Sequence, residues 1–211
     1  MPDTAHKIQC RCGQLQGHLS AGNTMRFVCY CRDCQAFAHA LGHPAQVLDA
    51  RGGTDVIATV QQNLHFTKGA EALACLSLSG RGIYRWYASC CNTPIGNTAR
   101  DPKLSYIALV HSCLAESPAA LDAGFGTQRV PVNGPRLKGK RGYSTPWAML
   151  SVARLIGAVV RARLTGRWKH TPLFATGAAG PIAAPHILSA EERRQAYEAV
   201  AAARAGANSA D

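Results

Sequence analysis

The sequence lacks any run of about 18 apolar residues, the length that a helix needs to cross a bilayer. Its first ten residues, MPDTAHKIQC, contain no apolar core of the kind that secretory signal peptides carry. Aromatic residues are sparse, at 7%, and 12 acidic residues face 23 lysines and arginines. These absences argue against a membrane-spanning or secreted protein, and we expect a cytoplasmic one.

Cysteine, by contrast, is abundant, with nine residues in 211. In a reducing compartment, clustered cysteines are more often metal ligands or reactive thiols than disulfides. Cys75 and Cys113 stand alone, and we interpret them as small buried hydrophobes. The remaining seven are clustered: Cys10, Cys12, Cys29, Cys31, Cys34, Cys90 and Cys91.

Positive charge is concentrated in the second half of the chain. Residues 116–211 contribute +7 of the net charge of +11, and between Arg129 and Lys169 there are ten basic residues and no acidic one. Such a block can meet phosphate, either of nucleic acid or of an anionic membrane surface, although a solvated basic face is the plainer interpretation.

Residues 1–115 have the pattern of a mainly β domain. Short alternating or apolar segments are separated by glycine-rich breaks such as RGGTD and SGRG. One segment in this half, RDCQAFAHAL, is typical of a short helix. The predicted strands lie in QLQGHLS, MRFVCY, ALACLSLS, IYRWYAS and LSYIALVHS.

The rest of the chain has a different composition. Residues 116–144 are rich in glycine, proline and basic residues, which indicates an irregular linker or wrapping arm. Residues 145–211 predict a helical extension. Its first helix begins at Thr145 as N-cap with Pro146 in the first position.

A second helix begins at a capping box formed by Ser189 and Glu192, and we expect Gly206 to end it. The first helix has an apolar run of about 14 residues, too short to cross a bilayer. It could pack on the β core, form a dimer contact, lie on a membrane surface or accompany nucleic acid.

The cysteine spacing indicates metal binding. Two cysteines separated by one strand residue share a face, and a Cys-x-x-Cys turn presents two thiolates to one ion. Soft thiolates favour zinc, with one or two ions per chain. Seven cysteines divide into four and three: Cys29, Cys31 and Cys34 make a self-contained group, and the Cys90–Cys91 pair could complete a site with Cys10 and Cys12.

CRCG, then CYCRDC, then an aromatic–arginine strand ending in Cys-Cys-x-Thr-Pro resemble the glutathione-dependent formaldehyde-activating enzyme family, which includes centromere-protein-V-like proteins. The resemblance covers residues 6–115. It implies a tent-like antiparallel β fold that binds two zinc ions. It also implies a structural site at Cys10, Cys12 and the late cysteines, and a catalytic zinc on Cys29, Cys31 and Cys34.

The late motif departs from that family. Family members read Cys-x-x-Cys-Gly-Thr, whereas this chain has Ala88 at the first cysteine position and Asn92 at the glycine. Asparagine tolerates the left-handed backbone that glycine adopts. Cys91 matches the second family cysteine. Cys90 could replace the ligand absent at Ala88, or turn toward the other group.

Two functions remain open. The resemblance implies a carbon–sulfur lyase acting on a small thiol adduct such as S-hydroxymethylglutathione, with Arg85 able to meet a carboxylate of the substrate. Alternation along the strand explains Arg85 equally well, with Trp86 facing inward and its neighbours outward. The rival is a non-catalytic zinc scaffold whose basic C-terminal half binds a partner, nucleic acid or an anionic membrane surface. A homo-oligomer is also possible. Ligation of the second metal by Cys90 would favour the scaffold.

Overall fold

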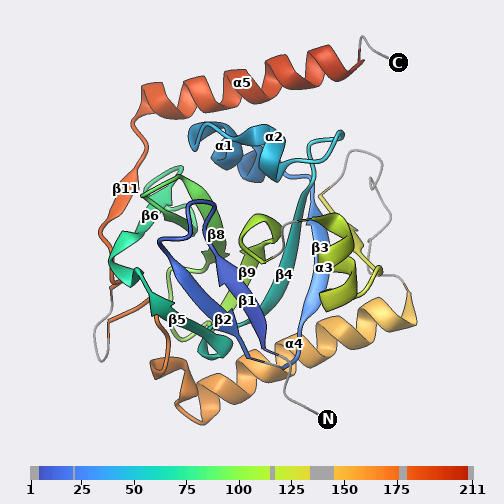
Figure 1. Cartoon of the computed structure of the whole chain (residues 1–211), viewed down its shortest axis with the longest axis vertical. Coiled ribbons are helices and arrows are strands. Elements are labelled where there is room, and N and C mark those ends of the chain that lie inside the picture. Colours follow the sequence, from blue (N-terminus) through green and yellow to red (C-terminus); the bar gives the residue numbers. More distant parts are fainter. Residues whose placement is uncertain (1–4, 21, 115–116, 134–144, 176–179, 209–211) are drawn as a thin grey trace.

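The computed structural model describes residues 5–20, 22–114, 117–133, 145–175 and 180–208, in which two β-sheets are flanked by helices (Figure 1). The strands are β1 (His6–Gln9), β2 (Gln16–Leu19), β3 (Met25–Cys29), β4 (Thr54–Val60), β5 (Leu64–Lys68), β6 (Leu73–Ser77), β7 (Tyr84–Ala88), β8 (Thr93–Thr98), β9 (Tyr106–Val110), β10 (Val130–Val132) and β11 (Pro185–Ile187). The α-helices are α1 (Arg32–Ala40), α2 (Pro44–Val47), α3 (Pro118–Phe125), α4 (Pro146–Leu164) and α5 (Ala190–Asn208). Single 3₁₀ turns are η1 (Gln61–Asn63), η2 (Ala70–Ala72), η3 (His111–Cys113) and η5 (Arg167–Lys169). A mainly β core with a C-terminal helical extension is the fold class that the sequence predicts.

The smaller sheet has strand order β1-β2-β5, and the larger sheet has order β10-β3-β4-β9-β8-β7-β6-β11. All neighbours pair antiparallel except at the two edges of the larger sheet, where β10 runs parallel to β3 and β11 runs parallel to β6. Parallel pairing needs a long return connection, which the C-terminal half of the chain provides. Both edge strands have three residues, too few for an alternating pattern to predict them.

The predicted linker, residues 116–144, is only partly described. Residues 134–144 lie outside the described part of the chain. Residues 117–133 contain α3 and β10, which an irregular arm does not predict. Ser117 caps α3, because its hydroxyl accepts a hydrogen bond from the Ala120 amide, and Pro118 follows at the first helical position.

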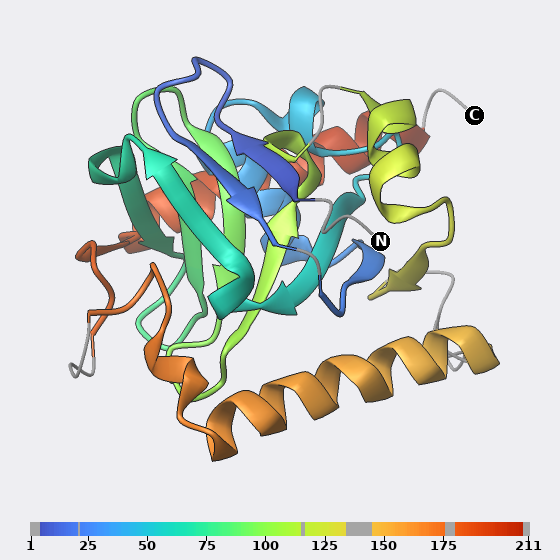
Figure 2. The same cartoon turned by 60° about the horizontal axis from the view of Figure 1, so that its bottom comes forward.

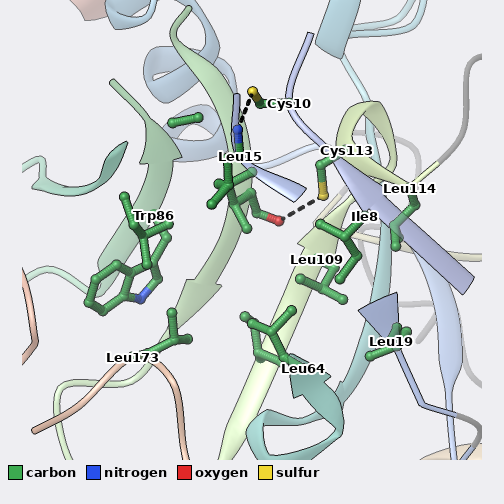
Figure 3. Packing of buried hydrophobic residues seen from close by; sticks show 14 of the residues in the cluster. Ile8, Cys10, Leu15, Leu19, Leu64, Trp86, Leu109, Cys113, Leu114 and Leu173 are labelled. Carbon is green, nitrogen blue, oxygen red and sulfur yellow. Dashed lines mark hydrogen bonds between the residues drawn. The ribbon is translucent and has the colours of Figure 1, made fainter. Parts of the chain in front are cut away.

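The two sheets bury a common apolar layer (Figure 3). Alternation along β7 sends Trp86 into this layer, where the indole Nε1 donates to Thr98 Oγ1 at 3.0 Å and the ring packs against Phe174. The smaller sheet contributes Ile8 and Leu64 from the other side. Cys113 belongs to the same layer and is buried, as expected for a small hydrophobe, and so does Cys75.

Helices cover the opposite face of the larger sheet. Helix α1 confirms the predicted short helix and packs through Phe37 against Leu76 of β6. Helix α5 then lies on α1 at the end of the molecule away from α4 (Figure 1). This helical layer buries the second face of the larger sheet.

The predicted helix starts are confirmed. Thr145 Oγ1 accepts from the Ala148 amide at the start of α4, and Ser189 and Glu192 form the reciprocal capping box of α5. The predicted end of α5 is wrong, because the helix continues through Gly206 to Asn208. A single glycine near the end of a helix costs only about 1 kcal/mol relative to alanine and need not stop it. Within the described part of the chain, no helix has the length and apolar character to cross a bilayer.

Replacing Trp86 tests the shared core. Trp86→Ala should lower the free energy of unfolding by about 3–5 kcal/mol, because it empties a fully buried site between the sheets. Leu104→Ala, at a side chain that is 42% exposed, is the control and should change it by less than about 0.5 kcal/mol. Urea denaturation of both variants measures the difference, and equal midpoints would contradict this placement of Trp86.

Candidate metal centres

Four cysteines from two distant turns form the first cluster. Cys10 and Cys12 follow β1, and Cys90 and Cys91 lie in the turn between β7 and β8. The four sulfur atoms all lie within 4.8 Å of one another. The closest pair is Cys12 and Cys90, with 3.3 Å between their Sγ atoms, and Cys90 Sγ lies 3.7 Å from Cys10 Sγ.

The β7–β8 turn explains how two adjacent cysteines can face one site. Residues 89–92 form the turn, so the strand rule that sends neighbours to opposite faces does not apply to Cys90 and Cys91. Asn92 adopts φ 55°, a left-handed conformation that asparagine tolerates. Cys90 therefore joins the first cluster and not the second, while Ala88 is fully buried in the core.

Arg11 joins the two turns of the first cluster. Its backbone amide donates to Thr93 Oγ1 at 3.0 Å, and its guanidinium donates to the Cys91 carbonyl at 2.9 Å. The same guanidinium donates to Gln46 Oε1 at 2.7 Å. A positive charge is thus held beside the four thiols of the first cluster.

Burial and hydrogen bonding shift the pKa values of the thiols in this cluster in different directions. Burial raises the pKa of Cys10, and burial together with the neighbouring thiols raises the pKa of Cys90. Burial alone would also raise the pKa of Cys91, but hydrogen bonds from Thr93 and Cys12 lower it to about 6. The site therefore stabilises one thiolate most strongly at Cys91, where Thr93 Oγ1 lies 3.1 Å from the sulfur.

Three cysteines form the second cluster where β3 passes into α1. Cys29 ends β3, Cys31 is the N-cap of α1, and Cys34 lies in its first turn. Cys31 Sγ accepts a hydrogen bond from the Cys34 amide at 3.3 Å, and Cys34 Sγ lies 3.6 Å from Cys29 Sγ. The start of α1 therefore brings the side chains of Cys31 and Cys34 close to Cys29 at the end of β3.

The second cluster lies against the larger sheet. Arg85 from β7 reaches under α1, is only 3% exposed, and directs its Nη1 to Cys34 Sγ at 3.9 Å and to Asn97 Oδ1 at 3.2 Å. Asn133 directs its amide nitrogen to Cys29 Sγ at 3.8 Å. The alternation that the sequence predicts is confirmed, since Trp86 and Arg85 lie on opposite faces of the larger sheet. The face that carries Arg85 is not exposed to solvent, because α1 covers it.

Thr54 is a further feature of this region that the sequence did not reveal. It pairs directly with Cys29 across β3 and β4, so the two side chains share one face. Its side chain is 2% exposed, and its Oγ1 has no hydrogen-bond partner among the described residues. A buried hydroxyl left without a partner is costly unless something else binds there.

Hydrogen bonds from Cys31 and Cys34 lower the pKa of Cys29 to about 2. Hydrogen bonds with Cys29 and Cys31 raise the pKa of Cys34. Three adjacent thiols cannot all ionise without a compensating cation. A divalent ion would supply that charge and release the retained protons.

Both donor sets fit a soft metal ion. The first cluster offers four sulfur atoms within reach of one ion, the number that a closed tetrahedral site requires. The second offers three among the described residues and has an orphan hydroxyl beside it. All seven predicted ligands are therefore brought together in the predicted groups of four and three.

One cavity adjoins the first cluster, and another is lined by residues next to the second cluster. A cleft of about 700 Å³ runs past Cys10 and Arg11 toward His111. A smaller pocket of about 210 Å³ lies between α1 and α5, where Arg85, Asp33 and Arg193 line it. This smaller pocket is connected to the second cluster through Arg85, and Asp33 directly precedes Cys34.

Comparison with known proteins identifies a family and a distantly similar solved structure. The profile of a family of unknown function (DUF6151) matches residues 4–183. None of the curated proteins compared with the chain matches it. A structural-genomics crystal structure of a Rhodobacter sphaeroides protein is 18% identical, with 55% of this chain and 94% of that chain covered and a TM-score of 0.37.

Oxidation of the metal-free protein tests the geometry of the first cluster. We expect diamide to link Cys12 to Cys90, because both are exposed and their sulfur atoms are already close. Mass spectrometry after trypsin should find residues 12–26 joined to residues 86–100, and Cys12→Ser should abolish that product. Cys113 should stay reduced as an internal control, and a link from Cys12 to Cys31 or Cys34 would contradict the arrangement.

Proposed function

The chain belongs to the DUF6151 family, and we propose that it is a zinc protein with one structural and one reactive centre, acting as a carbon–sulfur lyase on a small thiol adduct. Its resemblance in residues 6–115 to the formaldehyde-activating enzyme family motivates the chemistry. The observation that carries the proposal is the position of Cys90, which lies with Cys10 and Cys12 and leaves three cysteines at the second cluster.

Zinc is the metal that these ligands favour. All seven are cysteine sulfur atoms, and soft thiolates in tetrahedral sets select zinc over magnesium or calcium. A four-thiolate site is closed and structural, and here it would hold the turn after β1 against the β7–β8 turn. A three-thiolate site keeps one position for water or substrate, as catalytic zinc sites do.

The pocket between α1 and α5 supports a charged thiol as substrate. A glutathione-type thiol carries two carboxylates and one ammonium group. Arg85 and Arg193 in this pocket complement carboxylates, and Asp33 complements an ammonium. The Tyr197 hydroxyl donates to Asp33 Oδ1 at 2.7 Å and keeps that carboxylate in place.

The reaction needs no oxidant or reductant. In S-hydroxymethylglutathione, one carbon is bonded to sulfur and to a hydroxyl. Removal of the hydroxyl proton forms the aldehyde double bond, and the carbon–sulfur bond breaks with its electron pair leaving on sulfur. The sulfur then takes up the proton to give free thiol. Zinc bound by three thiolates would supply stabilisation of the departing thiolate, a task that suits a weak Lewis acid.

The chain's own residues would prepare this step. Cys29, Cys31 and Cys34 would hold the metal beside the buried sheet face. Arg85 would hold the substrate carboxylate and offset the negative charge of three thiolates. Thr54 would supply its free hydroxyl to the group in the fourth position. These roles combine electrostatic stabilisation with orientation of the substrate.

Metal analysis of cysteine variants tests the two centres. Purified protein should contain two zinc ions per chain by plasma mass spectrometry. The pairs Cys12→Ser/Cys90→Ser and Cys31→Ser/Cys34→Ser should each lose one ion. Release should increase as the pH falls, because protons compete for the thiolates. Cys75→Ser is the matched control and should keep both ions, since Cys75 belongs to neither cluster. Wild-type protein without zinc would overturn the proposal.

Turnover tests the chemistry separately from the metal. The protein should accelerate exchange between glutathione plus formaldehyde and their adduct, followed by NMR. Cys31→Ser/Cys34→Ser should reduce the rate to background. Arg85→Gln should slow the reaction about 10–100-fold while both zinc ions are retained, the range seen when residues supporting a metal site are removed. A wild-type rate equal to background, with both zinc ions present, would reject the lyase and leave the zinc scaffold.

A further inference from the structure

Helix α4 presents two different faces, and only one of them is used by the fold. Its inner face rests on β3 and β4, where Ala148 and Ala162 are buried and Val152 packs near Met25. Small residues at the contact let the helix approach the sheet closely. The helix runs along the outside of the molecule at the end away from α5, with its outer side facing solvent (Figure 2).

The outer face of α4 is apolar. Five large side chains on it are exposed, by 48% to 80% of their surface: Met149, Leu150, Ile156, Val160 and Leu164. Consecutive residues of a helix are separated by about 100°, so these five positions fall within an arc of about 120°. We call them the apolar stripe. Single exposed aliphatic side chains are normal, but a continuous stripe on one helix marks an interaction surface.

Arginines border the apolar stripe on both sides. Arg163 lies along one side, and Arg154 and Arg161 lie along the other. Arg154 and Arg161 also line a pocket of about 390 Å³ between α4 and the loops that carry Asn23 and Asn63. Arg167 is the third arginine that lines this pocket, and none of the lining residues is acidic.

The three arginines of this pocket lack charge compensation. Among the described residues, no ion pair joins Arg154, Arg161 or Arg167 to a carboxylate. Guanidinium groups that converge without a counter-charge repel one another. They are arranged for an anion, and planar guanidinium groups suit phosphate oxygens.

We propose that α4 docks on an anionic lipid surface. The apolar stripe would enter the boundary between head groups and acyl chains. The bordering arginines would remain at head-group level, and the pocket of Arg154, Arg161 and Arg167 would receive a lipid phosphate. An apolar helix face between basic residues is the arrangement that holds a helix in the plane of a membrane.

Charge and shape favour lipid over the other partners. The phosphates of nucleic acid could bind the arginines, but the five aliphatic side chains of the apolar stripe would then lie against hydrated phosphates. A second copy could cover the stripe, but pairing two stripes would bring arginines together. Arg163 has a partner in Asp101, at 3.9 Å, but among the described residues no ion pair neutralises Arg154 or Arg161.

Flotation with vesicles tests the proposal. The whole protein should float with phosphatidylcholine vesicles containing 30% phosphatidylserine and remain unbound with phosphatidylcholine alone. Binding should weaken as salt is raised from 50 to 500 mM, because screening reduces the attraction. The triple change Arg154→Gln/Arg161→Gln/Arg167→Gln should weaken binding by more than about tenfold.

A matched triple change controls for net charge. Arg51→Gln/Arg81→Gln/Arg194→Gln removes the same charge from exposed sites off α4 and should bind almost as wild type. Ile156→Glu/Val160→Glu tests the apolar stripe and should abolish flotation. Because both side chains are exposed, circular dichroism and zinc content should stay unchanged. Failure of the lyase assay would leave this result unaffected.

Three outcomes would overturn the proposal. The first is equal loss of binding in both triple variants, which would indicate nonspecific charge attraction. The second is tight binding to a 40-nucleotide RNA or DNA, measured by fluorescence anisotropy, without vesicle binding. The third is a dimer by light scattering that Ile156→Glu/Val160→Glu converts to a monomer, which would assign the apolar stripe to a second copy.

Discussion

The sulfur atoms of Cys10 and Cys90 lie 3.7 Å apart although 80 residues separate them in the chain. One belongs to the turn after a strand of the smaller sheet, and the other to a turn of the larger sheet, so their meeting fixes one sheet relative to the other. Ionised thiols at this distance repel, and a metal ion would turn that repulsion into a cross-link. Arg11 already joins the same two turns by hydrogen bonds to Thr93 and the Cys91 carbonyl. The buried layer around Trp86, which both sheets line, depends on this alignment.

The second cluster depends on the C-terminal helix α5. Cys31 and Cys34 belong to α1, which packs between the larger sheet and α5. Helix α5 holds α1 through the Tyr197 hydroxyl on Asp33 and through Arg204, whose Nε donates to Gln35 Oε1 at 3.0 Å. The proposed substrate pocket is therefore built from segments 164 residues apart, and the cysteines of the second cluster are held in place by a helix that contributes none of them.

Local sequence patterns predicted local structure. Alternation and short apolar runs predicted β2, β3, β6, β7 and β9, but not β1, β4, β5 or β8. Side-chain caps predicted the starts of α4 and α5, and counting cysteines predicted the groups of four and three. Features that depend on distant segments were not predictable: α1 covers the sheet above Arg85, Thr54 faces Cys29 without a partner, and the turn directs Cys90 toward Cys10. Gly206 shows the limit of a local signal, because glycine terminates a helix only weakly and α5 continues past it. Charge and hydropathy predicted the character of α4, but only the fold shows which face remains exposed.

The two edges of the larger sheet are closed by strands from the C-terminal half, since β10 covers β3 and β11 covers β6. During synthesis, residues 1–115 leave the ribosome with their cysteines in place but with the outer edges of β3 and β6 unpaired. An open strand edge is a template for pairing with another chain. The nascent protein therefore passes through a stage prone to aggregation that ends only when residue 187 has emerged. Chaperone demand should peak in this interval, and truncation before β11 should reduce the soluble yield more than its small size suggests.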